Sequence, residues 1–320
     1  MKNYFVTGGE GFVGRHLVQH LVQRGHHVVG GVRNRARKLS FEKQLGKALV
    51  CDVSDAISVA RAIASVKPEV VVHLASTSQP AFANQEPLTA YQSIVSGWAN
   101  VLDGVRRAVP RAKVLLISAA DVYGNACTPE QPATEDTPVQ PCDTFGSLKA
   151  AAESIAQTFY LNYHLDITTL RPFCLLGPGL PEQFFFGSLA RRFCEWDMAS
   201  HGKTCGLADS DYQRDAMHVA DFIEALDRLT DSGRPNCTYN ICSGQHHSVR
   251  DIAQALARAA NLDLNFTADD TAEPGPIACL WGDASRLSQH TGWKPSRSLD
   301  QAAGDLIASC RAQVQPAAAH

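Results

Sequence analysis

A glycine-rich loop between a short apolar strand and a helix is the feature that most limits how this chain can fold. The mainly apolar residues 4–7 precede three glycines spaced by three, Gly8, Gly11 and Gly14, and a helical pattern begins at Val13. Gly8 permits a tight turn, Gly11 lets the backbone approach a pyrophosphate, and Gly14 lets the helix pack closely on the sheet. The helix N-terminus then offers unpaired N–H groups to phosphate oxygens. We predict a dinucleotide site with contacts at Gly8, Gly11, Phe12, Val13 and Gly14.

Regular alternation of strand-like and helix-like segments predicts the fold class. Strand-like runs rich in apolar and β-branched residues lie at 4–7, 27–32, 48–50, 70–74, 114–118 and 166–171. Apolar patterns with the period of a helix lie between them, at 13–24, 57–64, 88–108 and 147–163. Such alternation implies right-handed crossovers and a parallel sheet covered by helices on both faces. We therefore predict an α/β protein with a Rossmann-type, doubly wound parallel sheet.

The second half of the chain is less regular and indicates a second lobe. Proline and glycine cluster at 177–181 and 273–276, and a strand pattern at 238–242 precedes helical patterns at 249–261 and 299–311. We predict an NAD(P)-binding domain at 1–170, to which 212–243 return. A smaller, discontinuous C-terminal substrate lobe would comprise 171–211 and 244–314, and 315–320 would be a tail.

Composition excludes several classes of protein. The 320 residues carry 29 Lys+Arg against 32 Asp+Glu, with no basic tract, which argues against a nucleic-acid partner. No apolar run approaches the roughly 20 residues that cross a bilayer, and the apolar start at 4–6 is too short for a secretory signal. The ten cysteines are scattered without a Cys-x-x-Cys pair. We expect reduced thiols, no metal site and a cytoplasmic location.

Cations follow the second predicted strand, where an acid would select NAD. The strand ends at Arg33, and Arg35, Arg37 and Lys38 come soon after it. An acid there would hold the ribose 2′-hydroxyl, whereas arginine grips a 2′-phosphate with a forked pair of hydrogen bonds. The pattern favours NADP, with NAD as the alternative coenzyme; a solvated basic loop would have the same composition. Glu10 is unfavourable beside a pyrophosphate unless it points to solvent.

A series of short motifs runs in order along nearly the whole chain. It consists of the loop 7–14, Cys51-Asp52-Val53, His73-Leu74-Ala75, the segment 118–124, Arg171-Pro172-Phe173 with Gly177-Pro178-Gly179, Arg214-Asp215-Ala216-Met217-His218-Val219 and Thr291-Gly292-Trp293-Lys294-Pro295. The series resembles the extended short-chain dehydrogenases/reductases of the nucleotide-sugar epimerase/dehydratase group. It is most similar to GDP-4-keto-6-deoxymannose reductases and GDP-mannose 4,6-dehydratases.

The resemblance implies roles for further residues and a partner. It implies a nucleotide-activated sugar as the small-molecule substrate and a homodimer joined by a four-helix bundle of segments 88–108 and 147–163. Alanines in the second segment permit close helix approach, which would also serve packing within one chain. The coenzyme contacts that it implies are Asp52, Val53, Leu74, Ala75, Lys149 and Pro172.

The acid/base pair that the resemblance implies is missing. In this family a Tyr four residues before a Lys transfers the proton, since the Lys charge lowers the phenol pKa from about 10. A Ser or Thr hydroxyl shares that proton with the substrate. Here Phe145 precedes Lys149, and Ala119 stands at the Ser/Thr position. Phe and Ala keep the approximate shape without the hydroxyls, so we expect the site to fold, with Phe145 and Ala119 bordering the substrate.

Three nearby residues are candidates for replacing the phenol. Asp121 lies where the dehydratases carry a Glu, and it can act as an acid or base or cap a turn. Tyr123 is the other nearby phenol, at a position that is structural in the family. Cys174 replaces an Asn that would face the sugar, either as a nucleophile or as an unreactive thiol.

Three arginines are candidate ligands for a substrate phosphate. Arg214 belongs to one of the family motifs, whereas Arg191 and Arg192 lie in a pattern that also fits a solvent-facing helix. The diphosphate-binding Arg that is usual near residues 271–274 has no counterpart in the sequence.

These observations support two classes of function. The first is an atypical NAD(P)-dependent epimerase, dehydratase or reductase of a nucleotide-activated sugar, and so an oxidoreductase, lyase or isomerase; a non-sugar substrate is allowed within this class. The alternative is a retired or engineered-inactive member that binds NADP or a sugar nucleotide without turnover.

Overall fold

The main sheet of the protein consists of seven parallel strands in the order β11-β6-β5-β4-β1-β2-β3. The computed structural model describes residues 1–269 and 274–314, so the predicted tail at 315–320 lies outside them. The strands are β1 (Asn3–Thr7), β2 (His27–Val32), β3 (Ala48–Val50), β4 (Val70–His73), β5 (Lys113–Ile117), β6 (Ile167–Pro172) and β11 (Cys237–Ile241). Each predicted strand is present to within one residue at either end. The doubly wound, Rossmann-type order is confirmed.

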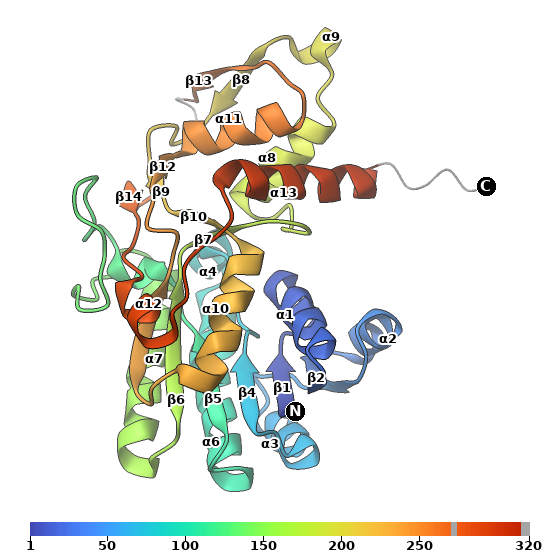
Figure 1. Ribbon diagram of the computed structural model, residues 1–320, viewed down its shortest axis with the longest axis vertical. Helices are drawn as coiled ribbons and strands as arrows, with labels where there is room; N and C mark the ends of the chain where they lie inside the picture. Colours follow the sequence, from blue (N-terminus) through green and yellow to red (C-terminus); the bar gives the residue numbers. More distant parts are fainter. Residues whose placement is uncertain (270–273, 315–320) are drawn as a thin grey trace.

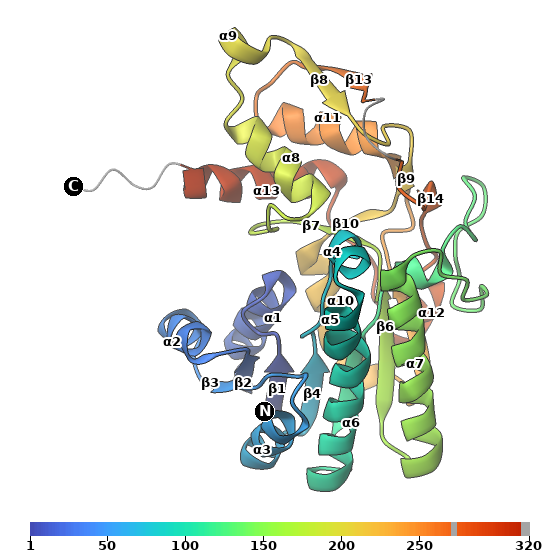
Figure 2. The same ribbon diagram turned by 180° about the vertical axis from the view of Figure 1, so that it is seen from behind.

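Helices cover both faces of this sheet, as Figures 1 and 2 show from opposite sides. Tyr4 and Val6 pack into the core on one face and Phe5 into the core on the other, because successive side chains of a strand alternate. The first face carries α1 (Phe12–Gln23), α2 (Arg35–Gln44), α10 (Val219–Ser232) and α12 (Ser285–Thr291). The second carries α3 (Ala56–Val66), α4 (Pro80–Gln85), α5 (Pro87–Tyr91), α6 (Gly97–Ala108) and α7 (Thr144–Tyr163).

Two segments differ from the sequence-based expectation. The predicted helix 88–108 is divided, because a π-helical turn, η1 (Gln92–Ser96), joins α5 to α6. Of the cations after β2, Arg33 precedes α2, whereas Arg35, Arg37 and Lys38 lie on α2, a helix that the sequence analysis did not predict. Asn34 caps that helix by accepting a hydrogen bond from the Arg37 backbone N–H, and Phe41 anchors it in the core. Local capping and one buried aromatic ring therefore outweigh the high charge of this segment.

A smaller group of elements lies beyond the carboxyl ends of the main strands (Figure 1). Its core is formed by helices that bury Phe193, Leu256 and Leu306 against one another. The elements are β7 (Cys174–Leu176), α8 (Phe185–Cys194), α9 (Met198–His201), β8 (Thr204–Leu207), β9 (Gln213–Arg214), β10 (Ala216–His218), β12 (His247–Ser248), α11 (Val249–Ala259), β13 (Asn265–Ala268), β14 (Cys279–Leu280) and α13 (Leu299–Val314). Among the described residues, no helix combines the length and apolar character needed to span a bilayer.

Candidate functional site

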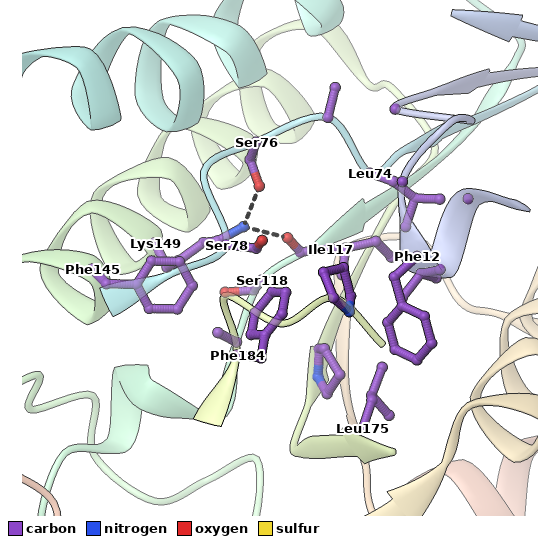
Figure 3. A pocket seen from close by; sticks show the side chains of 18 of the residues that line it. Phe12, Leu74, Ser76, Ser78, Ile117, Ser118, Phe145, Lys149, Leu175 and Phe184 are labelled. Carbon is purple, nitrogen blue, oxygen red and sulfur yellow. Dashed lines mark hydrogen bonds between the residues drawn. The ribbon is translucent and has the colours of Figure 1, made fainter. Parts of the chain in front are cut away.

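A cavity of about 640 Å³ lies at the carboxyl ends of the parallel strands. Its walls come from the loop after β1, the ends of β4 and β5, α7 and the segment 172–186 (Figure 3). Ligands of open α/β sheets bind at this edge. All the predicted coenzyme contacts line the cavity, namely Gly8, Gly11, Phe12, Val13, Gly14, Arg33, Asp52, Val53, Leu74, Ala75, Lys149 and Pro172.

The loop after β1 has the shape that a pyrophosphate needs. Gly8 has a φ of +69°, which favours glycine, and Gly11 is the N-cap residue of α1 with no side chain capping the helix. The first N–H groups of α1 are thus left for a ligand. A Cβ at Gly14 would overlap the carbonyl oxygen of Gly8 and lie 2.7 Å from the Gly9 Cα. The loop is therefore packed as tightly against α1 as a dinucleotide cradle requires.

The end of the cavity where we expect the adenosine of the coenzyme, called the adenosine end below, is formed by residues that follow β2 and β3. Arg33 lines it with an exposed side chain, while Glu10 reaches it from the phosphate loop. Asp52 accepts hydrogen bonds from the Ser54 backbone N–H at 3.0 Å and from its hydroxyl at 2.7 Å, which holds the Asp52 carboxylate in place. Residues of both charges therefore meet where the adenosine ribose would lie.

Lys149 lies at the centre of the cavity wall, buried on α7 (Figure 3). Its Nζ donates to the Ser76 hydroxyl at 3.1 Å and to the Ile117 carbonyl at 2.8 Å. Among the described residues these are its acceptors, so one ammonium proton is left for a ligand. Burial lowers the Lys149 pKa to about 8, although Glu153 and Asp121 oppose the shift. The sequence analysis did not identify Ser76 as a site residue. Its position directly after the strand-end motif 73–75 could have indicated this.

The place of the missing hydroxyls is apolar. Phe145 and Ala119 are both buried and line the cavity, with the Lys149 Nζ 5.7 Å from the Phe145 ring centre. Ser118 also lines the cavity, and its Oγ is buried without a hydrogen-bond partner in the part of the chain that the structure describes. Ser118 is a second polar residue that sequence reasoning did not single out. It supplies an unused hydroxyl one residue before Ala119.

Asp121 is an acidic residue that lines the cavity at the end where we expect the substrate. It lies in the short 3₁₀ turn η2 (Ala120–Tyr123) and is partly open to the cavity. Burial and the neighbouring Asp143 carboxylate raise the Asp121 pKa to about 6, against the opposing charges of Arg214 and Lys149. A carboxyl group with such a pKa can take up or release a proton near neutral pH.

The structure does not bring Tyr123 or Arg191 into the cavity. The Tyr123 hydroxyl donates to the Asn240 side chain at 2.6 Å and accepts from Arg171 at 2.9 Å, and burial raises its pKa to about 12. It is locked in a packing role because both of its hydrogen-bonding functions are used. Arg191 lies on α8 and pairs with Glu195 at 2.5 Å, so its guanidinium is held on the surface of that helix.

Cys174 and Arg214 both line the cavity. Burial raises the Cys174 pKa to about 12, although Arg214 opposes the shift, so the thiol stays protonated and is a poor nucleophile. The Arg214 guanidinium donates to the carbonyl groups of Gln213, Ala278 and Ile277, which fix its position at the wall. Residues 271–273, where the usual diphosphate-binding Arg is missing, lie outside the described residues.

Fold and cavity together are those of the extended short-chain dehydrogenases/reductases. A family model described as GDP-mannose 4,6 dehydratase matches residues 5–306, and the chain belongs to this family. The GDP-6-deoxy-D-mannose reductase of Pseudomonas aeruginosa is 27% identical over 318 residues, covering 98% of this chain and 99% of the reductase. A dTDP-glucose 4,6-dehydratase of Xanthomonas campestris is 27% identical, over 94% of this chain and 91% of the dehydratase.

Solved structures agree with this assignment. The structure of RMD from Pseudomonas aeruginosa, complexed with NADPH, superposes with a TM-score of 0.84 at 25% identity, covering 98% of this chain and all of RMD. The UDP-glucose 4-epimerase of Thermus thermophilus, complexed with NAD, has a TM-score of 0.86 at 24% identity over 96% of this chain and 98% of the epimerase. The second likeness concerns the fold alone.

Proposed function

We propose that this chain is an NAD(P)-dependent enzyme acting on a nucleotide-activated sugar, with Asp121 as the acid/base in place of the missing phenol. The observation that carries the proposal is that one cavity joins the glycine loop, Lys149 and Asp121, while Phe145 and Ala119 contribute no hydroxyl. The coenzyme supplies a hydride acceptor or donor. The similar structure that carries NADPH supports NADP as the coenzyme, and NAD is the alternative.

Each part of the cavity has a defined task in this proposal. The α1 N-terminus binds the pyrophosphate, and the free ammonium proton of Lys149 binds a ribose hydroxyl of the coenzyme. Asp121 removes a proton from a sugar hydroxyl as the carboxylate and returns it as the acid. Arg214 lies near Asp121 and offers positive charge to a substrate phosphate. Because Asp121 is charged above about pH 6, the site is ready for proton abstraction at neutral pH.

Turnover tests this function directly. The purified chain is incubated with NAD or NADP and GDP-, UDP- and dTDP-hexoses, and separately with NADH or NADPH and the 4-keto-6-deoxy forms of these sugars. We expect product by chromatography, or a change in nicotinamide absorbance, with at least one of these sugars. Coenzyme binding without any turnover would exclude the enzyme and support the alternative, a member that binds its ligands without catalysis.

The alternative rests on the joint loss of the phenol and the hydroxyl. The double variant Phe145→Tyr with Ala119→Ser restores both groups on a site that already holds Lys149. If the chain is an inactive member, this variant gains strong activity over an inactive parent. If Asp121 already transfers the proton, the double variant changes the rate by less than about tenfold.

We further propose a homodimer formed through the helices of the second sheet face. Leu88 and Tyr91 on α5 and Leu161 and Tyr163 near the end of α7 are large apolar side chains exposed on that face, which supports an interface there. In sedimentation we expect twice the chain mass of 34.6 kDa. Leu161→Asp shifts the protein toward monomer, whereas Leu39→Asp, an equally exposed leucine on α2, does not. A wild-type monomer would contradict this assembly.

The division of the chain into domains and its location are also proposals. We place the coenzyme-binding domain at 1–170 and 212–243, supported by the packing of β11 and α10 on the main sheet. The substrate lobe comprises 171–211 and 244–314.

All ten cysteines lie within the described residues and are free thiols, which supports a cytoplasmic enzyme.

A further inference from the structure

Glu10 places a carboxylate at the adenosine end of the cavity. It lies on the phosphate loop between Gly9 and Gly11, is half-buried and lines the cavity wall. Its Oε1 accepts a hydrogen bond from the Arg33 backbone N–H at 3.5 Å, directly after β2. Its Oε2 is buried and has no hydrogen-bond partner within residues 1–269 and 274–314. A buried, unpaired carboxylate oxygen is costly, so a ligand hydroxyl placed there is favourable.

Three arginines surround the Glu10 carboxylate: Arg15 lies on α1, Arg33 directly follows β2, and Arg37 lies on α2. Burial raises the Glu10 pKa, while the Arg33 backbone N–H and the charges of Arg37, Arg33 and Arg15 lower it. Arg15 also donates from its Nε to the Glu10 carbonyl at 2.9 Å. The positive charge that would attract a 2′-phosphate therefore faces a carboxylate that partly neutralises it.

The position of Glu10 supplies the acid that is missing at the end of β2. No acid stands at the end of β2, where one would bind the ribose 2′-hydroxyl, and the residue directly after the strand is Arg33. The Glu10 carboxylate reaches the same place from the glycine loop, because its Oε1 contacts the backbone of that very residue. One carboxylate and one guanidinium, from two different loops, thus border the coenzyme's ribose subsite.

We propose that Glu10 recognises the adenosine ribose of the coenzyme. Its carboxylate accepts a hydrogen bond from the ribose 2′-hydroxyl and repels a 2′-phosphate. This inference rests on the proposed coenzyme function. Arg33 then favours NADP and Glu10 favours NAD, and the balance between the two side chains sets the preference. Removal of the Glu10 charge shifts the two affinities in opposite directions.

The test is equilibrium titration of the full chain with NADH and with NADPH, followed by nicotinamide fluorescence. Glu10→Gln keeps the size of the side chain and removes its charge. We expect its Kd for NADPH to fall by about tenfold and its Kd for NADH to rise by about threefold or more. Glu42→Gln is the matched control, since Glu42 is an exposed acid on α2 whose partner is Lys38 and which does not line the cavity.

The outcomes separate this inference from the proposed function. If the wild type binds neither coenzyme, the proposed function fails and this inference fails with it. If the wild type binds coenzyme but Glu10→Gln leaves the ratio of the two Kd values unchanged, this inference alone is overturned. The same holds if Glu42→Gln changes the ratio equally, because the effect would then be one of net charge. Thermal unfolding of each variant without coenzyme verifies that the fold is retained.

Discussion

Asp121→Asn lowers kcat by about 100-fold or more on whichever nucleotide sugar the wild type converts, while coenzyme affinity stays within about threefold. The amide keeps the shape of the side chain in the η2 turn but cannot take up the substrate proton. Asp121 is an acidic residue that lines the cavity at the end where we expect the substrate, and Phe145 and Ala119 offer no hydroxyl to replace it. Steady-state kinetics and coenzyme titration of the same preparation measure the two quantities.

The pH dependence of kcat/KM carries a second signature of the same group. Asp121 acts as a base only when ionised, so the rate rises with pH through about 6. In the proposed mechanism the Lys149 ammonium ion binds the coenzyme ribose, so we expect the rate to fall again as Lys149 loses its charge through about pH 8. We expect a bell-shaped profile in the oxidising direction. The residual activity of Asp121→Asn lacks the acid limb; an unchanged acid limb would assign the proton transfer to another group.

Asp121→Asn raises the free energy of unfolding although it lowers kcat. The Asp121 pKa is raised in the folded protein, so ionisation of this carboxyl disfavours folding. The penalty is absent below about pH 4, where the carboxyl is protonated in both states. It grows as the pH rises and is complete above about pH 6. Asp121→Asn is therefore more stable than the wild type at about pH 8, by about 1–3 kcal/mol, and equal to it in acid. Asp136→Asn, at an exposed acid paired with Arg286, changes neither the rate nor its pH profile.

Gly14→Ala weakens coenzyme binding by about 100-fold or more, which calorimetric titration with NADPH and NADH measures. The new methyl group would overlap the Gly8 carbonyl oxygen and crowd the Gly9 backbone, so the phosphate loop must move away from α1. The loop cannot move without changing the N–H groups that face the pyrophosphate, and backbone atoms cannot rotate aside as a flexible side chain can.

A graded series of glycine variants distinguishes this effect from helix propensity. At Gly304 on α13 an added Cβ meets no atom within 4 Å, so Gly304→Ala leaves coenzyme binding unchanged and stabilises the helix slightly. At Gly11 the added Cβ approaches the Gly8 oxygen to 3.3 Å, so Gly11→Ala gives a smaller loss than Gly14→Ala and remains informative if Gly14→Ala unfolds. Wild-type affinity in Gly14→Ala would refute the phosphate-loop assignment.

Local patterns were enough to predict the framework of the protein. Strand alternation, helical periodicity and glycine spacing depend on residues a few positions apart, and the strands of the main sheet lie where these patterns put them. The helix α2 was not predicted from the sequence, because its high charge obscures the apolar pattern of a helix that Asn34 caps and Phe41 anchors. The π-helical turn η1 left no signal, since its residues continue an ordinary helical pattern.

The candidate site depended more on contacts between distant segments. Tyr123 could be a free phenol in the sequence, but Arg171 and Asn240, from two separate strands, occupy its hydroxyl. In the same way, Ser76 meets Lys149 across 73 positions of the chain, and Glu10 meets the Arg33 backbone across 23. Spacing along the chain carries no information on such pairs, because chain folding creates them.

The sequence by itself determined the doubly wound sheet and the glycine loop. It also determined that Phe145 and Ala119 stand where the family has a Tyr and a Ser or Thr. Each of these is a property of residue type and local order. Only the tertiary structure decided which polar groups face the cavity, that Asp121 and Lys149 have displaced pKa values, and that the Glu10 carboxylate contacts the Arg33 backbone. Burial and through-space charge control these properties, and both arise only when separate segments pack together.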